Sequence, residues 1–328
     1  MDKQWQQILA AFILGVMLPG MVARLGVGAA DPLPQIQIQI PETSMPSTEP
    51  REETAYQIPV LAMDGTVHEM ELDTYLVGVV LAEMPASFEM EALKAQAVVA
   101  RTYALRRVAE GVRHPDGAVC TDPGCCQAYV SPEDYQKSWG TLADVLKISL
   151  AVEATAGQVL TYNGMLAEAT YFSCSGGRTE DAAAVWGTDI PYLQAVDSPG
   201  EEQASPYTAT VSFTTAEFAA ALGRSLSGSP KEWLGVVTYT EGGGVATMVV
   251  AGISYTGVRL RQLLGLNSTA FTMSVTEGKI VITTLGKGHR VGMSQYGADA
   301  MAVTGSTCQQ ILDHYYPGTK IDKIGAIG

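Results

Sequence analysis

The sequence predicts an α+β protein in which an N-terminal membrane helix and a tether precede a two-lobed domain of helices and hairpins. Apolar residues recur at helical spacing in some segments, whereas turn pairs such as Asn163-Gly164 separate strand-like runs in others. The chain has 328 residues, of which 47% are hydrophobic and 16% charged, so it can bury a sizeable core in one large domain or two smaller ones. No internal repeat is visible.

The overall charge limits the classes of partner. The chain has a formal net charge of −14. The phosphates of nucleic acid and an anionic lipid surface both repel an acidic protein, so neither is expected as the main partner. Any anionic substrate must therefore be met by basic residues that gather locally.

The first element, residues 1–27, is predicted to be a membrane anchor or a signal segment. Residues 8–22 read ILAAFILGVMLPGMV and would form a helix of about 22 Å, against a hydrocarbon core of ~30 Å. The stretch approaches spanning length when residues 5–23 are counted. The alternative is a cleaved signal peptide, because Val27-Gly28-Ala29 offers small residues at a cleavage site. We favour the anchor, and in either case the rest of the chain is expected outside the cytoplasm.

Residues 28–55 are predicted to be an extended linker, because they are rich in proline and in acidic and hydroxyl side chains. A short IQIQI alternation could be a strand, but the flanking prolines disfavour it. The folded domain is expected at 56–318, with a tail at 319–328. It begins with two strand-like runs on either side of Asp64-Gly65, which predict a hairpin.

A helix that carries Glu83 in its last turn is predicted after this hairpin. Asp73-Thr74 can cap its start, and Pro85 disfavours helical geometry at the residue before it. A carboxylate is disfavoured at this end, because the free carbonyls carry the negative end of the helix dipole. If Glu83 is a general acid with a pKa of roughly 6 to 7, burial must dominate, since the dipole supplies less than about one unit. The alternative is a solvated glutamate at a frayed helix end.

A second helix is predicted to begin at Ser87 and to run to Arg107 before Gly111, with acidic residues in its first turn and arginines in its last. The segment 206–270 could form an inserted lobe. The other local signals are hairpins at Asn163-Gly164, Gly242-Gly243-Gly244 and Glu277-Gly278, and a capping box formed by Thr214 and Glu217.

The loop HPDGAVCTDPGCCQAY contains four potential metal ligands, His114, Cys120, Cys125 and Cys126. Thiolates and imidazole are good Zn²⁺ ligands, and six-residue steps separate His114, Cys120 and Cys126, but only short-spaced four-ligand patterns are diagnostic. If a metal is bound, we expect these three residues to hold it, with Cys125 not a ligand. A disulfide within the loop is the alternative outside the cytoplasm, as are free thiols.

Two glycine-rich segments could line a binding groove. In TYFSCSGGRTED, the glycines admit close approach of a ligand beside Arg178. A Cys174/His289 nucleophile is a weaker interpretation, because no helix N-terminus is obvious at the cysteine. In GKGHRVGMSQYGADAMA, glycines present His289 from a turn and Ser294 can cap a helix. The alternative for His289 is an ordinary surface histidine. Cys308 and His314, in the last helix, look structural.

Taken together, these segments resemble the stage II sporulation protein D family, which includes amidase enhancers. The resemblance spans about residues 56–318 and is carried by EMP (83–85), EALKAQAVVARTYAL (91–105), CQAY (126–129), SGGRT (175–179), VWG (185–187) and GHRVGMSQYGADAMA. It implies a membrane-anchored, extracytoplasmic lytic transglycosylase that acts on peptidoglycan during engulfment, alongside a partner amidase and a membrane protein of the engulfment machinery. It also implies that Glu83 is catalytic, and that zinc is held in the loop before CQAY.

The residues predicted to bind substrate lie in or beside these matched segments. They are Arg101, Tyr103, Ser173, Ser175, Gly176, Gly177, Arg178, His289, Ser294, Gln295 and Tyr296. Two positions depart from the family pattern, Arg290 in place of a glycine and Cys174 in place of another small residue. A non-catalytic, wall-binding activator of an amidase remains the alternative function, with Glu83 only structural.

Overall fold

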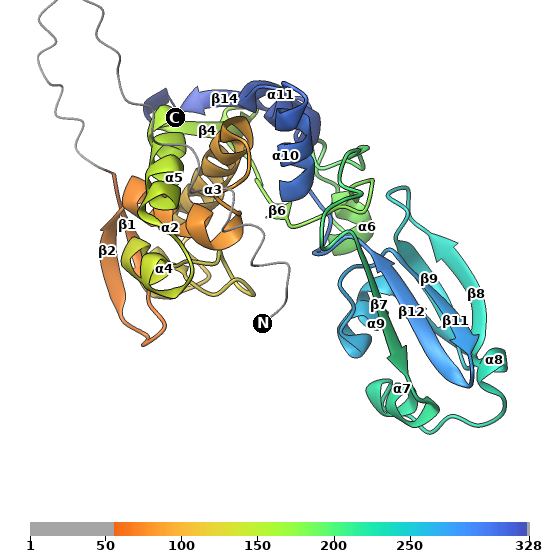
Figure 1. Cartoon of the computed structure of the whole chain (residues 1–328). Helices are drawn as coiled ribbons and strands as arrows, with labels where there is room; N and C mark the ends of the chain where they lie inside the picture. The colour runs from red at the N-terminus through yellow and green to blue at the C-terminus, as the bar shows by residue number, and fades with distance from the viewer. Residues whose placement is uncertain (1–55, 327–328) are drawn as a thin grey trace, which may run out of the picture. The chain divides into compact units, whose positions relative to one another are not determined.

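The computed structural model describes residues 56–326 as a mixed α+β fold (Figure 1). The predicted α+β class is thus confirmed. The anchor predicted at 1–27 and the linker predicted at 28–55 lie outside the described residues. None of the helices between residues 56 and 326 is both long enough and apolar enough to cross a bilayer.

Buried side chains form two separate cores, one in each of two lobes. The elements of the first lobe are β1 (Gln57–Leu61), β2 (Val67–Glu71), α2 (Leu72–Glu83), α3 (Met90–Glu110), β3 (Val119–Cys120), α4 (Pro132–Ser138), α5 (Leu142–Ala154), β4 (Gln158–Tyr162), β5 (Met165–Leu166), β6 (Tyr171–Phe172), α6 (Ala182–Trp186), β13 (Met293–Ser294), α10 (Gln295–Val303), α11 (Cys308–Tyr315) and β14 (Lys320–Lys323). Those of the second lobe are β7 (Thr208–Phe213), α7 (Thr215–Ala221), α8 (Pro230–Trp233), β8 (Leu234–Tyr239), β9 (Val245–Val250), β10 (Ile253–Thr256), α9 (Gly257–Leu264), β11 (Phe271–Thr276) and β12 (Lys279–Leu285).

Helix α3 is the centre of the first core. It is rich in alanine and other good helix formers, and its middle is buried because α2, α5, α10 and α11 pack around it (Figure 1). It ends as predicted, at Gly111, whose φ of 62° is left-handed. The predicted start at Ser87 is wrong: Phe88 closes a turn onto the Pro85 carbonyl (3.0 Å), and the helix begins at Met90.

The hairpins follow the predicted turn pairs. The Asp64-Gly65, Asn163-Gly164, Gly242-Gly243-Gly244 and Glu277-Gly278 segments each connect two antiparallel strands. In the Asn163-Gly164 turn the φ angles are 51° and 78°. Two successive positive φ angles give a turn whose twist matches that of the flanking strands, which is why Asn-Gly is favoured there. The capping box of Thr214 and Glu217 also forms, at the start of α7.

The second lobe extends beyond the predicted segment 206–270. Strand β12 pairs with both β11 and β7, so the sheet order is β11-β12-β7, and the sheet reaches Leu285 while the core of this lobe reaches Ile282. The predicted tail at 319–328 is also partly structured, because β14 pairs antiparallel with β4 and thereby joins a sheet of the first lobe. The β12–β7 and β14–β4 pairings leave no local sequence signal, since each joins segments far apart in the chain.

Arg290 ties the two lobes together. Its φ of 67° is left-handed, which accounts for the glycine expected at this position. The guanidinium is buried and donates to the carbonyls of Ser175 (2.7 Å) and Gly242 (2.8 Å), and to the Glu180 carboxylate (3.1 Å). Because Gly242 belongs to the β8–β9 turn, these bonds fix that turn of the second lobe against the first.

Candidate active site

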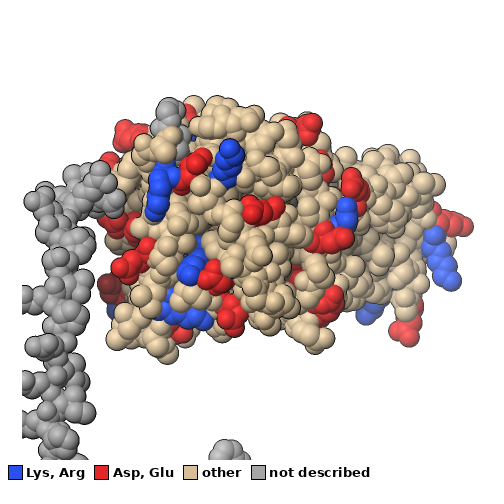
Figure 2. All heavy atoms as spheres, turned by 90° about the horizontal axis from the view of Figure 1, so that it is seen from above, with Lys and Arg blue, Asp and Glu red and all other residues tan. Residues whose placement is uncertain are grey.

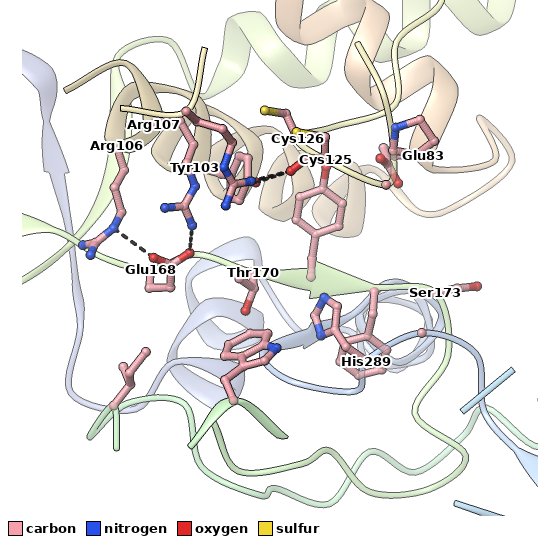
Figure 3. A pocket seen from close by; sticks show the side chains of 18 of the residues that line it. Glu83, Tyr103, Arg106, Arg107, Cys125, Cys126, Glu168, Thr170, Ser173 and His289 are labelled. Carbon is pink, nitrogen blue, oxygen red and sulfur yellow. Dashed lines mark hydrogen bonds and ion pairs between the residues drawn. The ribbon is translucent and has the colours of Figure 1, made fainter. Parts of the chain in front are cut away.

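A cleft of about 870 Å³ lies at the junction of the two lobes. The residues that line it come from the ends of α2 and α3, the cysteine loop, β6, α6, the 286–289 turn and α9, as the close-up in Figure 3 shows in part. They are Glu83, Tyr103, Arg106, Arg107, Arg113, Pro123, Gly124, Cys125, Cys126, Glu168, Thr170, Tyr171, Phe172, Ser173, Trp186, Thr188, Ile190, Arg261, Lys287, Gly288 and His289.

Glu83 is the last residue of α2, as predicted, because Met84 already has the extended geometry that Pro85 requires. The predicted N-cap of this helix is wrong. The Glu71 carboxylate caps it by accepting the backbone N–H groups of Asp73 (3.0 Å) and Thr74 (2.6 Å). The Asp73 carboxylate is instead engaged elsewhere, in an ion pair.

Two donors hold the Glu83 carboxyl group in the cleft. Its Oε1 accepts a hydrogen bond from the backbone N–H of Ala128 (2.9 Å), and its Oε2 accepts one from Nε2 of Gln295 (3.4 Å). Burial raises the pKa of Glu83, while the hydrogen bonds from Ala128 and Gln295 lower it by less. Glu83 is therefore a fixed, partly desolvated carboxyl group rather than a solvated one at a frayed end.

The second carboxylate of the cleft is neutralised. Glu168 forms ion pairs with Arg106 (3.0 Å) and with Arg107, drawn as dashed lines in Figure 3. This cluster lies on one side of the cavity and Glu83 on the other. Among the described residues that line the cleft, Glu83 is thus the one carboxyl group without a cationic partner.

His289 faces the cavity between two aromatic rings, with ring centroids 5.6 Å from Phe172 and 5.4 Å from Trp186. Burial and, secondarily, the positive charge of Arg261 lower the pKa of His289 to about 4. Its Nδ1 accepts the backbone N–H of Val291 (3.1 Å), so the neutral ring carries its proton on Nε2. A neutral imidazole of this kind can orient a ligand, but it is not a strong acid at pH 7.

The cysteine loop brings four metal-binding groups together. The ligand atoms of His114, Cys120, Cys125 and Cys126 all lie within 4.8 Å of one another, and the thiols are not joined in disulfides. Three thiolates and one imidazole at this spacing fit a tetrahedral metal site. The sequence predicts that Cys125 is not a ligand, but the structure places its thiol in the same group, because the chain turns back between Asp122 and Cys126 and presents both adjacent thiols to His114.

The loop also forms part of the cleft. Cys125 and Cys126 line it, and the backbone of Ala128, two residues further on, donates to Glu83. The Cys125 carbonyl accepts hydrogen bonds from Tyr103 (3.5 Å) and Arg113. A metal ion in this cluster would therefore stabilise the segment that positions the Glu83 carboxyl group.

The structure brings some of the predicted substrate-binding residues to the cleft and leaves others outside. Tyr103, Ser173 and His289 line it, and Gln295 contacts Glu83. Arg101 does not. Its side chain is 0% exposed and donates to Asp73 (2.9 Å) and to the Thr155 carbonyl (2.9 Å), so a role in binding glycan is incompatible with its position.

The SGGR segment supports the cleft instead of lining it. Ser175 and Gly176 donate backbone N–H groups to the buried Glu201 carboxylate (2.7 and 3.3 Å), and Gly177 donates to the Ser175 hydroxyl (2.9 Å). Arg178 pairs with two exposed carboxylates, those of Asp197 and Glu241. Cys174 donates to Glu201 (2.9 Å), so its thiol is buried in a structural network and not poised as a nucleophile.

Ser294 and Tyr296 also have structural roles. Ser294 caps α10, as predicted, by accepting the Gly297 N–H (3.2 Å). The Tyr296 ring packs edge-on against Phe88, with centroids 5.0 Å apart. Neither side chain lines the cleft.

Several residues of the cleft were missed by the sequence-based reasoning. The sequence predicts the Arg106-Arg107 doublet only as part of a helix end. It identifies VWG at 185–187 only as a matched motif. Tyr171, whose hydroxyl accepts Nε2 of Gln127 (3.0 Å), stands in a segment read only as a strand. Glu168, Arg261 and Lys287 gave no signal, because tertiary contacts alone bring them to the cleft.

A family model and several known proteins are similar to this chain. A family model described as "SpoIID: Stage II sporulation protein" matches residues 63–162. Stage II sporulation protein D of Bacillus subtilis (strain 168) is 44% identical over 266 residues, which cover 80% of this chain and 77% of that protein. The protein of the same name in Bacillus amyloliquefaciens is 41% identical over 83% of this chain and 80% of its own. The amidase enhancer of B. subtilis is 30% identical over 75% of this chain and 40% of its own length.

Proposed function

The chain belongs to the stage II sporulation protein D family, and we propose that it is a peptidoglycan lytic transglycosylase that acts during engulfment. The observation that supports this activity is the state of the two carboxyl groups in the cleft. Glu83 is partly desolvated and has no cationic partner, whereas Glu168 is neutralised by two arginines. The cleft thus offers one carboxyl group for proton transfer, not the pair that ordinary glycosidases use.

A single carboxyl group suffices for a lytic transglycosylase. The protonated Glu83 gives its proton to the oxygen of the bond from N-acetylmuramic acid to N-acetylglucosamine, and the bond from C1 to that oxygen breaks. The resulting carboxylate then takes the proton of the 6-hydroxyl of muramic acid, whose oxygen closes on C1. The product is a 1,6-anhydro sugar, and no water is consumed.

The environment of Glu83 suits both steps. Burial favours its protonated form before the first transfer. The Ala128 N–H and the Gln295 amide then stabilise the carboxylate that the first transfer leaves. His289 has a pKa of about 4 and so remains a neutral donor that can orient the sugar.

Zinc is the metal that we propose for the cluster of His114, Cys120, Cys125 and Cys126, where four protein ligands leave no open position for catalysis. Its role would be structural, because the loop that it closes holds Ala128 against Glu83.

A wall-binding activator of an amidase is the second candidate function. The observation that favours it is the similarity to the amidase enhancer. In either case we propose peptidoglycan strands and a partner amidase as binding partners, together with a membrane protein of the engulfment machinery. We also propose that the chain is anchored in the membrane by its N-terminal segment, with the folded domain outside the cytoplasm.

The products of digestion test the reaction. Incubation of the protein with purified peptidoglycan should release fragments that end in 1,6-anhydro-muramic acid, which mass spectrometry separates from hydrolysis products by the mass of one water. Reducing-end products alone would show hydrolysis. If the chain releases no glycan products but increases the activity of an added amidase, the activator function would be favoured.

The pH dependence of cleavage tests the role of the protonated carboxyl group. Because burial raises the pKa of Glu83, its acid form persists to higher pH than the usual value of 4.5 would allow. We expect kcat/KM to fall tenfold per pH unit above this raised pKa, as the acid form is lost. His289, with a pKa of about 4, should not set this limb. A rate that rises with pH across the same range would contradict the assignment.

A further inference from the structure

The cleft is basic although the chain is acidic. Five of the 20 lysines and arginines line it, against two carboxylates, while the whole chain has a net charge of −14. On the face of the molecule drawn in Figure 2, by contrast, basic side chains lie among acidic ones. The five cations are Arg106, Arg107, Arg113, Arg261 and Lys287. Such a concentration attracts an anionic ligand and raises its local concentration.

Protein groups occupy some of these cations but not others. Glu168 pairs with Arg106 and Arg107. Within residues 56–326, no carboxylate lies at ion-pair distance from Arg113, Arg261 or Lys287. The Arg113 guanidinium nevertheless donates to the Cys125 carbonyl and so has a structural partner. Arg261 and Lys287 remain as the cations available to a ligand.

Arg261 is fixed in place by its own backbone surroundings. It stands in the last turn of α9, and its Nε donates to the Leu266 carbonyl (3.3 Å). The next segment is tied to the 286–289 turn, because Gly288 donates its N–H to the Asn267 carbonyl (3.0 Å). These bonds bring Arg261 of the second lobe to the same cleft as Lys287 and His289, and its charge lowers the pKa of the histidine.

The terminal amino groups of Arg261 have no hydrogen-bond partner among the described residues, although the side chain is half-buried on the cleft wall. These amino groups are accessible from the cleft rather than sealed in the protein, so a bound anion could accept charge-assisted hydrogen bonds from them. The planar fork of arginine matches the two oxygens of a carboxylate, and a neighbouring lysine adds a second, mobile charge.

We propose that Arg261 and Lys287 bind a carboxylate of the peptidoglycan strand, so that the second lobe selects acidic glycan for the cleft. This proposal rests on peptidoglycan as the substrate. Muramic acid carries a lactyl group whose carboxylate is free in a peptide-free strand, whereas in a peptide-bearing strand the carboxylates lie further out on the stem peptide. N-acetylglucosamine has neither group. The site would thus distinguish muramic acid from the sugar that alternates with it.

Equilibrium binding tests the proposal without relying on cleavage. The full chain with Glu83→Gln is titrated with peptide-free strands, with peptide-bearing strands, and with both after their carboxylates have been converted to neutral amides. Loss of a charged hydrogen-bonding partner should weaken binding of the Arg261→Gln variant to unmodified strands by about 10- to 100-fold. The Arg261→Gln variant and its Glu83→Gln parent should bind the amidated strands equally. The parent should bind amidated strands more weakly than unmodified strands by the same factor of about 10- to 100-fold.

One matched control lies on the same helix as Arg261, and another on the strand that precedes the 286–289 turn. Arg259 is exposed on α9 outside the cleft, and Lys279 is exposed on β12, so Arg259→Gln and Lys279→Gln remove the same charges from the chain but not from the site. Both should bind unmodified strands like the background. Arg261→Lys should retain part of the affinity, because it keeps the charge but not the planar fork.

The outcomes distinguish a lactyl carboxylate from one on the stem peptide, and they separate the carboxylate site from the transglycosylase assignment. An Arg261→Gln defect on peptide-free strands identifies the lactyl carboxylate, and one confined to peptide-bearing strands identifies the stem peptide. An equal defect on amidated strands, or none on unmodified strands, would overturn the carboxylate site. Should selective binding hold while the wild-type chain yields no anhydro products, the transglycosylase assignment would fail and the binding site would stand.

Discussion

Substitution of Glu83 by glutamine is expected to abolish most glycan cleavage while leaving the fold and glycan binding intact. The amide oxygen of glutamine can still accept the Ala128 N–H that Glu83 accepts at 2.9 Å, so the side chain keeps its position. It cannot deliver or accept a proton. The rate should fall by at least the ~100- to 10,000-fold that general acid–base groups contribute, and by more if one residue performs both transfers. The release of anhydro products over time measures the loss.

A matched control and a stability measurement sharpen this test. Glu133 is exposed on α4 and does not line the cleft, so Glu133→Gln should cleave at the wild-type rate. Because burial raises the pKa of Glu83, its ionised form is disfavoured in the folded state, and the stability associated with the neutral form is lost as the pH rises through the folded pKa. The Glu83→Gln variant should therefore melt at a higher temperature than wild type at neutral pH, with a smaller difference below pH 4.5. Wild-type cleavage by this variant would show that Glu83 is only a helix end.

Loss of a cysteine ligand should unfold the loop and lower the stability of the whole domain. Cys120→Ser leaves three of the four ligands that lie within 4.8 Å of one another. Structural zinc sites contribute apparent binding free energies of ~10–16 kcal/mol in small peptides, and loss of even about 3 kcal/mol would lower the melting temperature by roughly 6–12 °C. Metal content by mass spectrometry and thermal unfolding should fall together.

Neighbouring cysteines distinguish a metal site from general sensitivity to thiol loss. The structure places Cys125 in the cluster, so Cys125→Ser should also lose metal. Cys308 is buried in α11, outside the cluster, and Cys308→Ser should retain full metal content. Cleavage should fall in the cluster variants as well, because Ala128 is held against Glu83 by the same loop. Metal-free protein with unchanged stability would exclude a structural metal here.

The two lobes contribute different groups to the cleft, so substitutions far from Glu83 are expected to affect it. Glu83 and the cysteine loop belong to the first lobe, whereas Arg261 comes from the second. Arg290 and Glu180 fix the β8–β9 turn between them through buried, charge-assisted hydrogen bonds. Substitutions at this pair are thus expected to act on both stability and substrate binding, since removing one partner leaves a buried charge uncompensated.

Local sequence signals by themselves determined several elements of the fold. Helix α2 ends at Glu83 because Pro85 constrains the residue before it, and the Asn163-Gly164 pair forms a hairpin because both residues tolerate a positive φ. These properties depend on neighbours in the chain and can be read without a structure. The same holds for the cysteine loop, whose four potential ligands lie within a span of 13 residues, from 114 to 126. Its detailed ligand set could not be read, because the turn that presents Cys125 depends on backbone hydrogen bonds.

Tertiary structure alone decided which side chains meet in the cleft. Arg101 belongs to a matched motif but is buried by its pairing with Asp73, whereas Arg261, without any motif, reaches the site from the second lobe. Glu168 could not be recognised as neutralised until its two arginines were in place. The raised pKa of Glu83 likewise results from burial by residues distant in the chain. Desolvation and charge pairing depend on three-dimensional neighbours, so the sequence could single out Glu83 but not the surroundings that control its proton.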